Sequence, residues 1–282
     1  MAADKKNRSR RKARKARQSG FIRRHWRLIL LLLVLLLAAW HWFNGTAKVQ
    51  RWIWNSRNQP VNTNFSFSES IPEIEIEIAG QRPYNPNWFT QGFTIYDGKL
   101  LIGTGQRGRS RLITAGLYKD TVYKSVPLAN QYFGEGVTVV RDSLIYQLTY
   151  KSGVAFLYRG TDLERLGTLS YNTEGWGLVY WPEKDVLIQS DGTSTLYYRD
   201  PESFEVRWTE RVSDGIGSIA KVNEMEYVDG AIWANLWGTQ YLARIDPETG
   251  EVTGKADLGP VISRVRRNAI TGVLNGVAYD SS

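Results

Sequence analysis

Five residues that could take part in chemistry recur along this 282-residue chain at intervals of 41 to 52 residues. They are Gln91, Glu135, Trp176, Asn223 and Asn275. The set contains one carboxylate, three carboxamides and an indole. A carboxylate whose pKa is raised by burial can act as a general acid and base. Aromatic surfaces suit a small, partly cationic ligand.

Histidine and cysteine chemistry is excluded from most of the chain. The only two histidines, His25 and His41, precede residue 44, and there is no cysteine. The rest of the chain therefore has no Ser-His-Asp or Cys-His catalytic site and lacks the usual zinc ligands. The sequence predicts no metal site and no cofactor. Calcium in a central channel, held by a carboxylate and backbone carbonyls, stays open.

The net charge of +8 comes entirely from the N-terminus. Residues 1–27 contain twelve of the 36 Lys and Arg but one of the 28 acidic residues, which leaves the remainder at −3. We therefore interpret residues 1–27 as a basic cytoplasmic tail and expect no nucleic-acid partner. A tail that binds RNA is the alternative.

An apolar run follows this tail at once. Residues 28–40 are all apolar, and aromatic residues flank them. We predict a membrane-anchor helix at 28–43, a tether at 44–72, and a single-pass protein of the cell inner membrane. The positive-inside rule keeps the N-terminus cytoplasmic and puts the rest on the periplasmic, extracytoplasmic side. A cleaved signal peptide, with 45–47 as its cleavage site, is the rival interpretation.

The positions of the five residues belong to a longer repeat. Each complete unit of about 40–50 residues predicts four short strands joined by turns rich in Gly, Ser, Thr and Asp, including the similar turns at 200–203 and 246–250. This pattern predicts an all-β protein, a five-bladed β-propeller over 73–282. Only six residues follow Gly276, so we expect the fifth blade to be incomplete and the chain to be truncated at its C-terminus. The alternative is a ring that closes in an unusual way.

The first strand of each propeller blade lines the central axis, so the five residues should meet at one mouth. Glycine follows four of them and would let another group approach the backbone. Further aromatic residues should lie at the same rim: Phe89, Phe133, Tyr150 and Trp237. We predict that Glu135 is the acid and base. We interpret Glu174, Glu224 and Glu226 as partners for turns and for Arg or Lys, although Glu226 is a spare acid. Alternatively, the polar residues only hold ordered water and the glycines only form turns.

Seven motifs, in order and at blade spacing, resemble the plant and bacterial-type glutaminyl-peptide cyclotransferases. They are 89–92 (FTQG), 133–136 (FGEG), 148–153 (LTYKSG), 174–178 (EGWGL), 190–196 (SDGTSTL), 223–227 (NEMEY) and 233–237 (WANLW). The resemblance covers residues 80–280. It implies a five-bladed propeller and a zinc-independent aminoacyltransferase. Such an enzyme cyclises the N-terminal glutamine of peptides or proteins to pyroglutamate and releases ammonia.

The resemblance also implies roles for the residues at the predicted mouth. Glu135 would take a proton from the substrate α-amine and deliver one to the departing ammonia. Asn223, as the second catalytic residue, and Gln91 would bind the γ-amide or its developing oxyanion. The remaining substrate-binding residues would be Phe89, Phe133, Tyr150, Trp176, Trp237 and Asn275.

Two departures from the family pattern leave an alternative function open. Tyr150 stands where the family usually has Trp, and the Lys that the family carries in its last blade is absent. Lys255 lies in a Thr-Gly-Lys segment one blade too early to replace it. The alternative is a catalytically inactive propeller that serves as a peptide or protein-binding platform at the cell envelope.

Overall fold

The computed structural model describes residues 65–119, 121–264 and 272–281. The basic tail, the predicted membrane anchor and most of the predicted tether lie outside these ranges. Within them, no helix is both long and apolar enough to span a membrane. The described ranges all belong to one compact unit, Arg57–Ser282.

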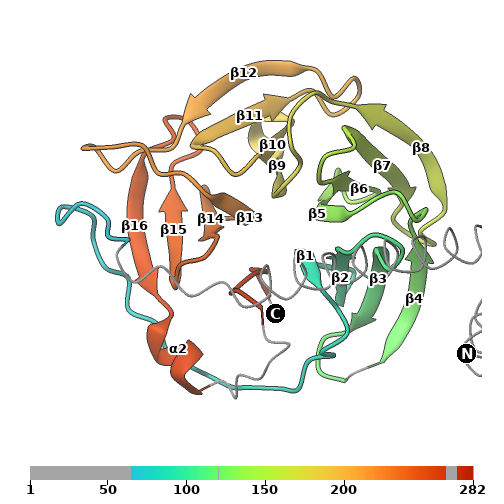
Figure 1. Ribbon diagram of the computed structural model, residues 1–282, viewed down its shortest axis with the longest axis horizontal. Helices are drawn as coiled ribbons and strands as arrows, with labels where there is room; N and C mark the ends of the chain where they lie inside the picture. The colour runs from blue at the N-terminus through green and yellow to red at the C-terminus, as the bar shows by residue number, and fades with distance from the viewer. Residues whose placement is uncertain (1–64, 120, 265–271, 282) are drawn as a thin grey trace, which may run out of the picture. The chain divides into compact units, whose positions relative to one another are not determined.

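The described ranges form a β-propeller of four antiparallel sheets arranged around a common axis (Figure 1). In each sheet the strands lie in sequence order, from the axis outward. Blade 1 contains β1 (Thr90–Tyr96), β2 (Lys99–Thr104), β3 (Arg111–Gly116) and β4 (Val122–Pro127). Blade 2 contains β5 (Gly134–Val140), β6 (Leu144–Thr149), β7 (Val154–Arg159) and β8 (Arg165–Ser170). Blade 3 contains β9 (Leu178–Trp181), β10 (Val186–Ser190), β11 (Thr195–Arg199) and β12 (Val206–Arg211). Blade 4 contains β13 (Val222–Val228), β14 (Ala231–Leu236), β15 (Tyr241–Ile245) and β16 (Val252–Asp257).

Local sequence explains the hairpins. The β1–β2 and β13–β14 turns are Asp-Gly pairs, Asp97–Gly98 and Asp229–Gly230, with positive φ at both residues. That conformation suits a tight hairpin and favours Asp followed by Gly. Two helical elements lie in the described ranges: η1 (Pro182–Lys184) joins β9 to β10, and α2 (Gly259–Arg264) follows β16.

The hydrophobic core lies between neighbouring blades rather than within one sheet. Leu101 and Leu112 of blade 1 pack with Val137 and Phe156 of blade 2. A larger cluster joins the sheets of blades 3 and 4. No single sheet can bury both of its faces, so the propeller is stabilised by stacking of its repeats.

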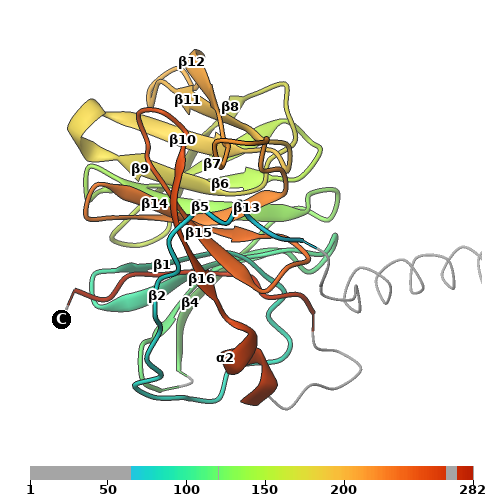
Figure 2. The same cartoon turned by 90° about the vertical axis from the view of Figure 1, so that its left-hand side faces the viewer.

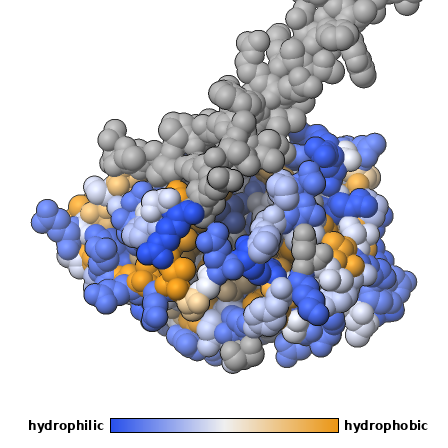
Figure 3. All heavy atoms as spheres, turned by 90° about the horizontal axis from the view of Figure 1, so that it is seen from below, coloured by the Kyte–Doolittle hydropathy of each residue, from blue (hydrophilic) through white to orange (hydrophobic). Residues whose placement is uncertain are grey.

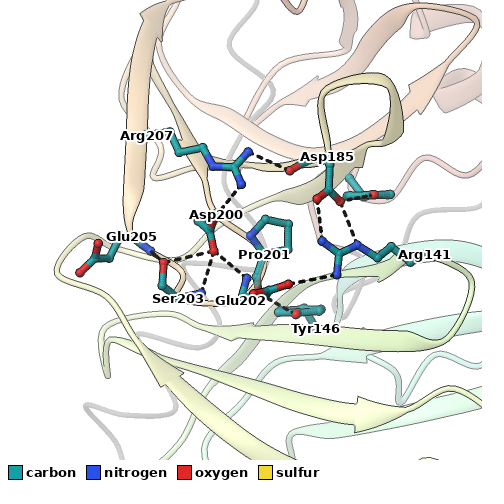
Figure 4. Close-up of polar contacts among 10 residues, drawn as sticks. Arg141, Tyr146, Asp185, Asp200, Pro201, Glu202, Ser203, Glu205 and Arg207 are labelled. Carbon is teal, nitrogen blue, oxygen red and sulfur yellow. Dashed lines mark hydrogen bonds and ion pairs between the residues drawn. The ribbon is translucent and has the colours of Figure 1, made fainter.

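Hydrogen bonds also join neighbouring blades. Tyr146 of blade 2 donates a hydrogen bond to Pro201 O in the Asp-Pro turn of blade 3, at 2.7 Å. Tyr198 of blade 3 does the same to Pro247 O of blade 4, at 2.6 Å. Beside the first contact, Arg141 forms a two-pronged ion pair with Asp185 (Figure 4). Exposed ion pairs of this kind contribute little, so the buried tyrosines do more to join the blades.

The prediction of five blades is wrong: the described residues form four. The fifth repeat, within 272–281, forms no strand there. Its backbone donors go to side chains instead, because Gly276 N donates to Asn235 Oδ1 and Val277 N donates to Glu224 Oε2. The segment lies near the centre of the ring, beside β1 and β13 (Figure 1).

The N-terminal described segment, 65–89, wraps part of the ring. Its backbone pairs with β16, where Ile74 N donates to Lys255 O and Lys255 N donates to Pro72 O. It then runs past α2 to β1 (Figures 1 and 2). Seen from below the view of Figure 1, apolar side chains lie in small groups between polar ones (Figure 3). The predicted first strand at 73–78 is reduced to a single parallel bridge, Glu73 with Lys255.

Candidate active site

Four of the five repeated residues form one hydrogen-bonded chain. Asn223 Nδ2 donates to Asn275 Oδ1 at 2.9 Å. Asn275 Nδ2 donates to Gln91 Oε1 at 2.7 Å, and Gln91 Nε2 donates to Glu135 Oε1 at 3.2 Å. We call these four residues the amide relay. It joins strands β13, β1 and β5 and the C-terminal described segment, and it ends on the carboxylate.

Irregular backbone pairing at the start of three inner strands determines where these side chains point. The antiparallel register shifts between Thr90 and Gly92, between Gly134 and Val137, and between Val222 and Met225. Each shift leaves a relay residue of the inner strand outside the regular pairing: Gln91, Glu135 or Asn223. A β-bulge of this kind re-aims a side chain, as it often does beside active sites.

Glu135 is 4% exposed. Burial raises its pKa well above the ordinary value, because an ionised carboxylate is poorly solvated there. The hydrogen bond from Gln91 lowers the pKa again, and the charge of Glu174 raises it. A carboxyl group with a raised pKa can both accept and return a proton near neutral pH.

Glycines let the inner strands approach closely around the axis. A Cβ on Gly92 would lie 2.4 Å from Val137 N, and one on Gly136 would lie 2.5 Å from Trp176 O. A Cβ on Gly177 would lie 2.0 Å from the carbonyl oxygen of Asn223. The group that approaches each glycine is thus the backbone of the next blade.

Aromatic rings form two groups at the same end of the inner strands. Phe133 contacts Phe89 edge to face, with ring centroids 6.0 Å apart, and lies 5.9 Å from Tyr150. Trp176 meets Trp237 edge to face at 6.2 Å. These five rings could contact a small ligand with an apolar stem and a cationic end.

Glu174 and Lys151 hold part of this aromatic surface. Glu174 accepts a hydrogen bond from Trp176 Nε1 at 3.1 Å and pairs with Lys151 Nζ at 2.9 Å. Lys151 Nζ lies 4.8 Å from the centre of the Tyr150 ring. Partial burial acts to raise the pKa of Glu174, but the bonds from Lys151 and Trp176 leave it lowered. The pKa values of the two acids are thus shifted in opposite directions, downward for Glu174 and upward for Glu135.

The sequence profile of the glutamine cyclotransferase family matches residues 52–282. The chain belongs to this family. It is 32% identical over 232 residues to the glutaminyl-peptide cyclotransferase of Arabidopsis thaliana, which covers 80% of this chain and 71% of that protein. It is also similar to the crystal structure of Myxococcus xanthus glutaminyl cyclase, with a TM-score of 0.64 and 32% identity. That match covers 71% of this chain and 84% of the other. The predicted family is therefore confirmed.

In this family member, the nine predicted site residues lie in three connected sets. The amide relay contains Gln91, Glu135, Asn223 and Asn275. One group of rings contains Phe89, Phe133 and Tyr150, and the other contains Trp176 and Trp237. Asn275 donates to Gln91 Oε1 and to Thr90 O, so both hydrogens of its carboxamide are already used within the protein. Among the described residues, no group of three or more His, Cys, Asp or Glu could hold a metal ion.

Sequence reasoning misjudged two acids of β13. The interpretation of Glu174 as a partner for Lys is confirmed, whereas Glu224 and Glu226 bind no Arg or Lys in the described part of the chain. Glu224 accepts the backbone N–H groups of Phe93 and Val277. Glu226 accepts the hydroxyl of Thr94 and a backbone hydrogen bond from Tyr279. One signal in the sequence pointed to this role: Glu224 stands where the other four repeats have glycine.

Proposed function

We propose that this chain is a glutaminyl-peptide cyclotransferase with Glu135 as its acid and base. The observation that carries the proposal is the buried carboxyl of Glu135, at the end of the amide relay in a member of this family. The relatives that the chain matches include one named for this activity. The substrates are peptides or proteins that begin with glutamine.

The reaction is intramolecular. The α-amino nitrogen of the substrate attacks the γ-carbonyl carbon of the same glutamine, and the new C–N bond closes a five-membered ring. Glu135 takes a proton from the attacking amine and gives it to the γ-amide nitrogen, which leaves as ammonia when its C–N bond breaks. Because both reacting groups belong to one residue, the protein gains most by holding them in the ring-forming geometry.

The carboxamides of the relay supply hydrogen-bond donors. Each carboxamide nitrogen carries two hydrogens, and the relay uses one from Asn223 and one from Gln91. Their second hydrogens can bind the γ-carbonyl oxygen and stabilise the oxyanion that forms during attack. The rings of Trp176, Trp237 and Phe133 would hold the glutamine side chain and its amine.

Lys255 is not a counterpart of the Lys that the family carries in its last blade. Lys255 belongs to β16, the outermost strand of blade 4, and its backbone pairs with the N-terminal segment. Among the described residues, Lys151 and Lys221 lie at the aromatic surface, the latter 5.6 Å from the centre of the Trp237 ring. The proposed mechanism needs no lysine to transfer the proton.

We further propose that residues 28–43 anchor the protein in the cell inner membrane. The thirteen-residue apolar run at 28–40 and the basic residues before it support this location. The N-terminus would be cytoplasmic, and the propeller would meet its substrates on the periplasmic side.

The experiment is an ammonia-release assay on the full chain with a Gln-initiated dipeptide amide. The same dipeptide with an acetylated amine is the control, since the mechanism requires a free α-amine as nucleophile. Release from the free peptide alone supports the proposal. Saturable binding of that peptide without release would instead favour the binding platform, and release from the acetylated peptide would indicate a simple amidase.

A further inference from the structure

Glu224 is an acid in the register where the other inner segments have glycine. Its side chain is buried, and each carboxylate oxygen binds a different segment. Oε1 accepts the backbone N–H of Phe93 in β1 at 3.0 Å, and Oε2 accepts that of Val277 at 2.7 Å. One side chain of blade 4 therefore holds both β1 and the C-terminal described segment.

The two bound amides have matching places in the sequence. Phe93 lies two residues after Gln91, and Val277 lies two residues after Asn275. The amides that Glu224 holds are therefore only two residues along the chain from the Gln91 and Asn275 carboxamides, which bond at 2.7 Å. A carboxylate that fixes the backbone at Phe93 and Val277 limits how far Gln91 and Asn275 can move relative to each other.

Side chains of blade 4, rather than backbone pairing between strands, hold the C-terminal segment in place beside β1. Asn235 Oδ1 accepts the N–H of Gly276 at 2.8 Å. Gly276 has φ of +100°, and a Cβ there would lie 3.2 Å from Phe93 Cβ, so the segment packs closely on β1. No strand pairing is assigned between β1 and residues 272–281.

We propose that Glu224 is a positioning residue: it sets the Gln91–Asn275 pair and, through it, the hydrogen bond from Gln91 to Glu135. The inference rests on the proposed function, in which Glu135 moves the proton. A carboxylate fits this role because it offers an acceptor oxygen to each segment, whereas a carboxamide has only one acceptor oxygen.

Glu226 provides a matched control on the same strand. It is partly buried and bridges the same two segments, since it accepts the Thr94 hydroxyl at 2.9 Å and a backbone hydrogen bond from Tyr279. Thr94 and Tyr279, however, lie farther along the chain from Gln91 and Asn275 than the amides that Glu224 binds. Glu226→Gln removes the same charge but loosens only these more distant contacts, so it should leave the relay intact.

The test compares profiles of kcat/KM against pH for the full chain, Glu224→Gln, Glu226→Gln, Asn275→Ala and the double variant Glu224→Gln/Asn275→Ala. Gln91 lowers the pKa of Glu135, so a loosened Gln91 moves the ascending limb of the profile to higher pH. The other titratable groups that interact with Glu135 are Glu174, Tyr150 and Tyr171, which all variants keep.

We expect Glu224→Gln to lose about tenfold to a hundredfold in kcat/KM, less than the loss of a donor that touches the oxyanion directly, and to shift the limb upward. Glu226→Gln should stay within about threefold of the parent, because the relay is untouched. If Glu224 acts through Asn275, the double variant should lose no more than the worse single variant. A folded Glu224→Gln with the parental limb, or additive losses in the double variant, would overturn the proposal.

Two further measurements test the proposal if Glu224→Gln does not fold or if the parent protein is inactive. Should Glu224→Gln fail to fold, Glu224→Asp keeps both acceptor oxygens on a shorter stem, and parental kinetics in that variant would overturn the proposal. An inactive parent would refute the proposed function alone. Calorimetric binding of the Gln-initiated dipeptide amide then decides the positioning role, with about tenfold weaker binding expected for Glu224→Gln and unchanged binding contradicting it.

Discussion

Two neighbouring side chains shift the pKa of Glu135 in opposite directions. The Gln91 hydrogen bond favours the ionised form of Glu135, and the Glu174 charge disfavours it. Burial has a larger effect than either neighbour, so the pKa of Glu135 is raised overall. The ascending limb of the pH profile should therefore respond to both neighbours.

Replacing Gln91 with Leu should raise the pKa of Glu135, because the hydrogen bond that stabilises its carboxylate is lost. We expect an ascending limb at higher pH and a loss in kcat/KM of about a hundredfold, since a donor to the reacting oxygen also disappears. Kinetic profiles from pH 5 to about 9 measure both effects. Leucine at the exposed Gln81 is the control, and an unmoved limb in Gln91→Leu would contradict the account.

Replacing Glu174 with Gln should move the same limb the other way. The variant removes a negative charge that raises the pKa of Glu135, while glutamine can still accept the Trp176 N–H. The shift should be small because Glu174 is partly exposed and solvent screens its charge. Lys151→Met is a useful partner variant: it leaves Glu174 charged without its cation, so it should move the limb upward.

At the scale of elements, the sequence predicted the strands well because their repeat is regular. The Asp-Gly hairpins, the Asp-Pro turns and the inner-strand glycines each have a strong local signal. The bulges beside Gln91, Glu135 and Asn223 do not, because a register shift depends on the partner strand. The amide relay was likewise beyond prediction, since spacing places residues at one mouth without giving their hydrogen bonds.

Blade 3 holds its part of the site with a buried cation. Arg199 donates to Gln189 Oε1 at 2.5 Å and to Phe204 O at 2.8 Å. Gln189 in turn donates to Glu174 O at 2.7 Å. The equivalent pair in blade 2 is neutral, with Tyr158 donating to Gln147 at 3.4 Å. Arg199 therefore supports the turn that presents Glu174 and Trp176.

Methionine at Arg199 should destabilise the fold by about 2 kcal/mol or more, because buried acceptors such as Gln189 Oε1 lose their donor. Phenylalanine at Tyr158 should cost about 1 kcal/mol or less, since its bond is long. Urea denaturation followed by tryptophan fluorescence compares the two. Equal losses in both variants would show that the buried charge has no special role in blade 3.

At the scale of the whole molecule, the buried Glu224 and the partly buried Glu226 help to close the ring between blades 4 and 1. Burial raises the pKa of Glu226 to about 7, and burial together with the neighbouring Glu226 raises that of Glu224 well above normal. The sequence did not predict this closure. Its repeat implied a fifth sheet, whereas the described C-terminal segment is held by side chains.

The raised pKa values predict how stability depends on pH. An unfolded Glu ionises near pH 4.3, whereas folded Glu226 resists ionisation up to about pH 7, so the free energy of unfolding falls as pH rises between these values. Asp185 and Asp200 have lowered pKa values and lose their contribution below about pH 4. The melting temperature should thus peak near pH 5 and fall toward pH 8. Glu226→Gln should show a smaller fall, and an equal fall in both proteins would contradict this origin.

The proposed reaction depends most on Glu135, and one variant tests the role of this carboxyl directly. Glutamine at position 135 keeps the size and can still accept the Gln91 hydrogen bond, but it cannot carry a proton between the two nitrogens. Ammonia release from a Gln-initiated dipeptide amide should fall by about 10²- to 10⁴-fold in kcat, the usual contribution of a general acid and base, with peptide binding largely kept. The exposed Glu164→Gln serves as the control. A folded Glu135→Gln enzyme with the kcat of the parent would show that the proton moves through another group.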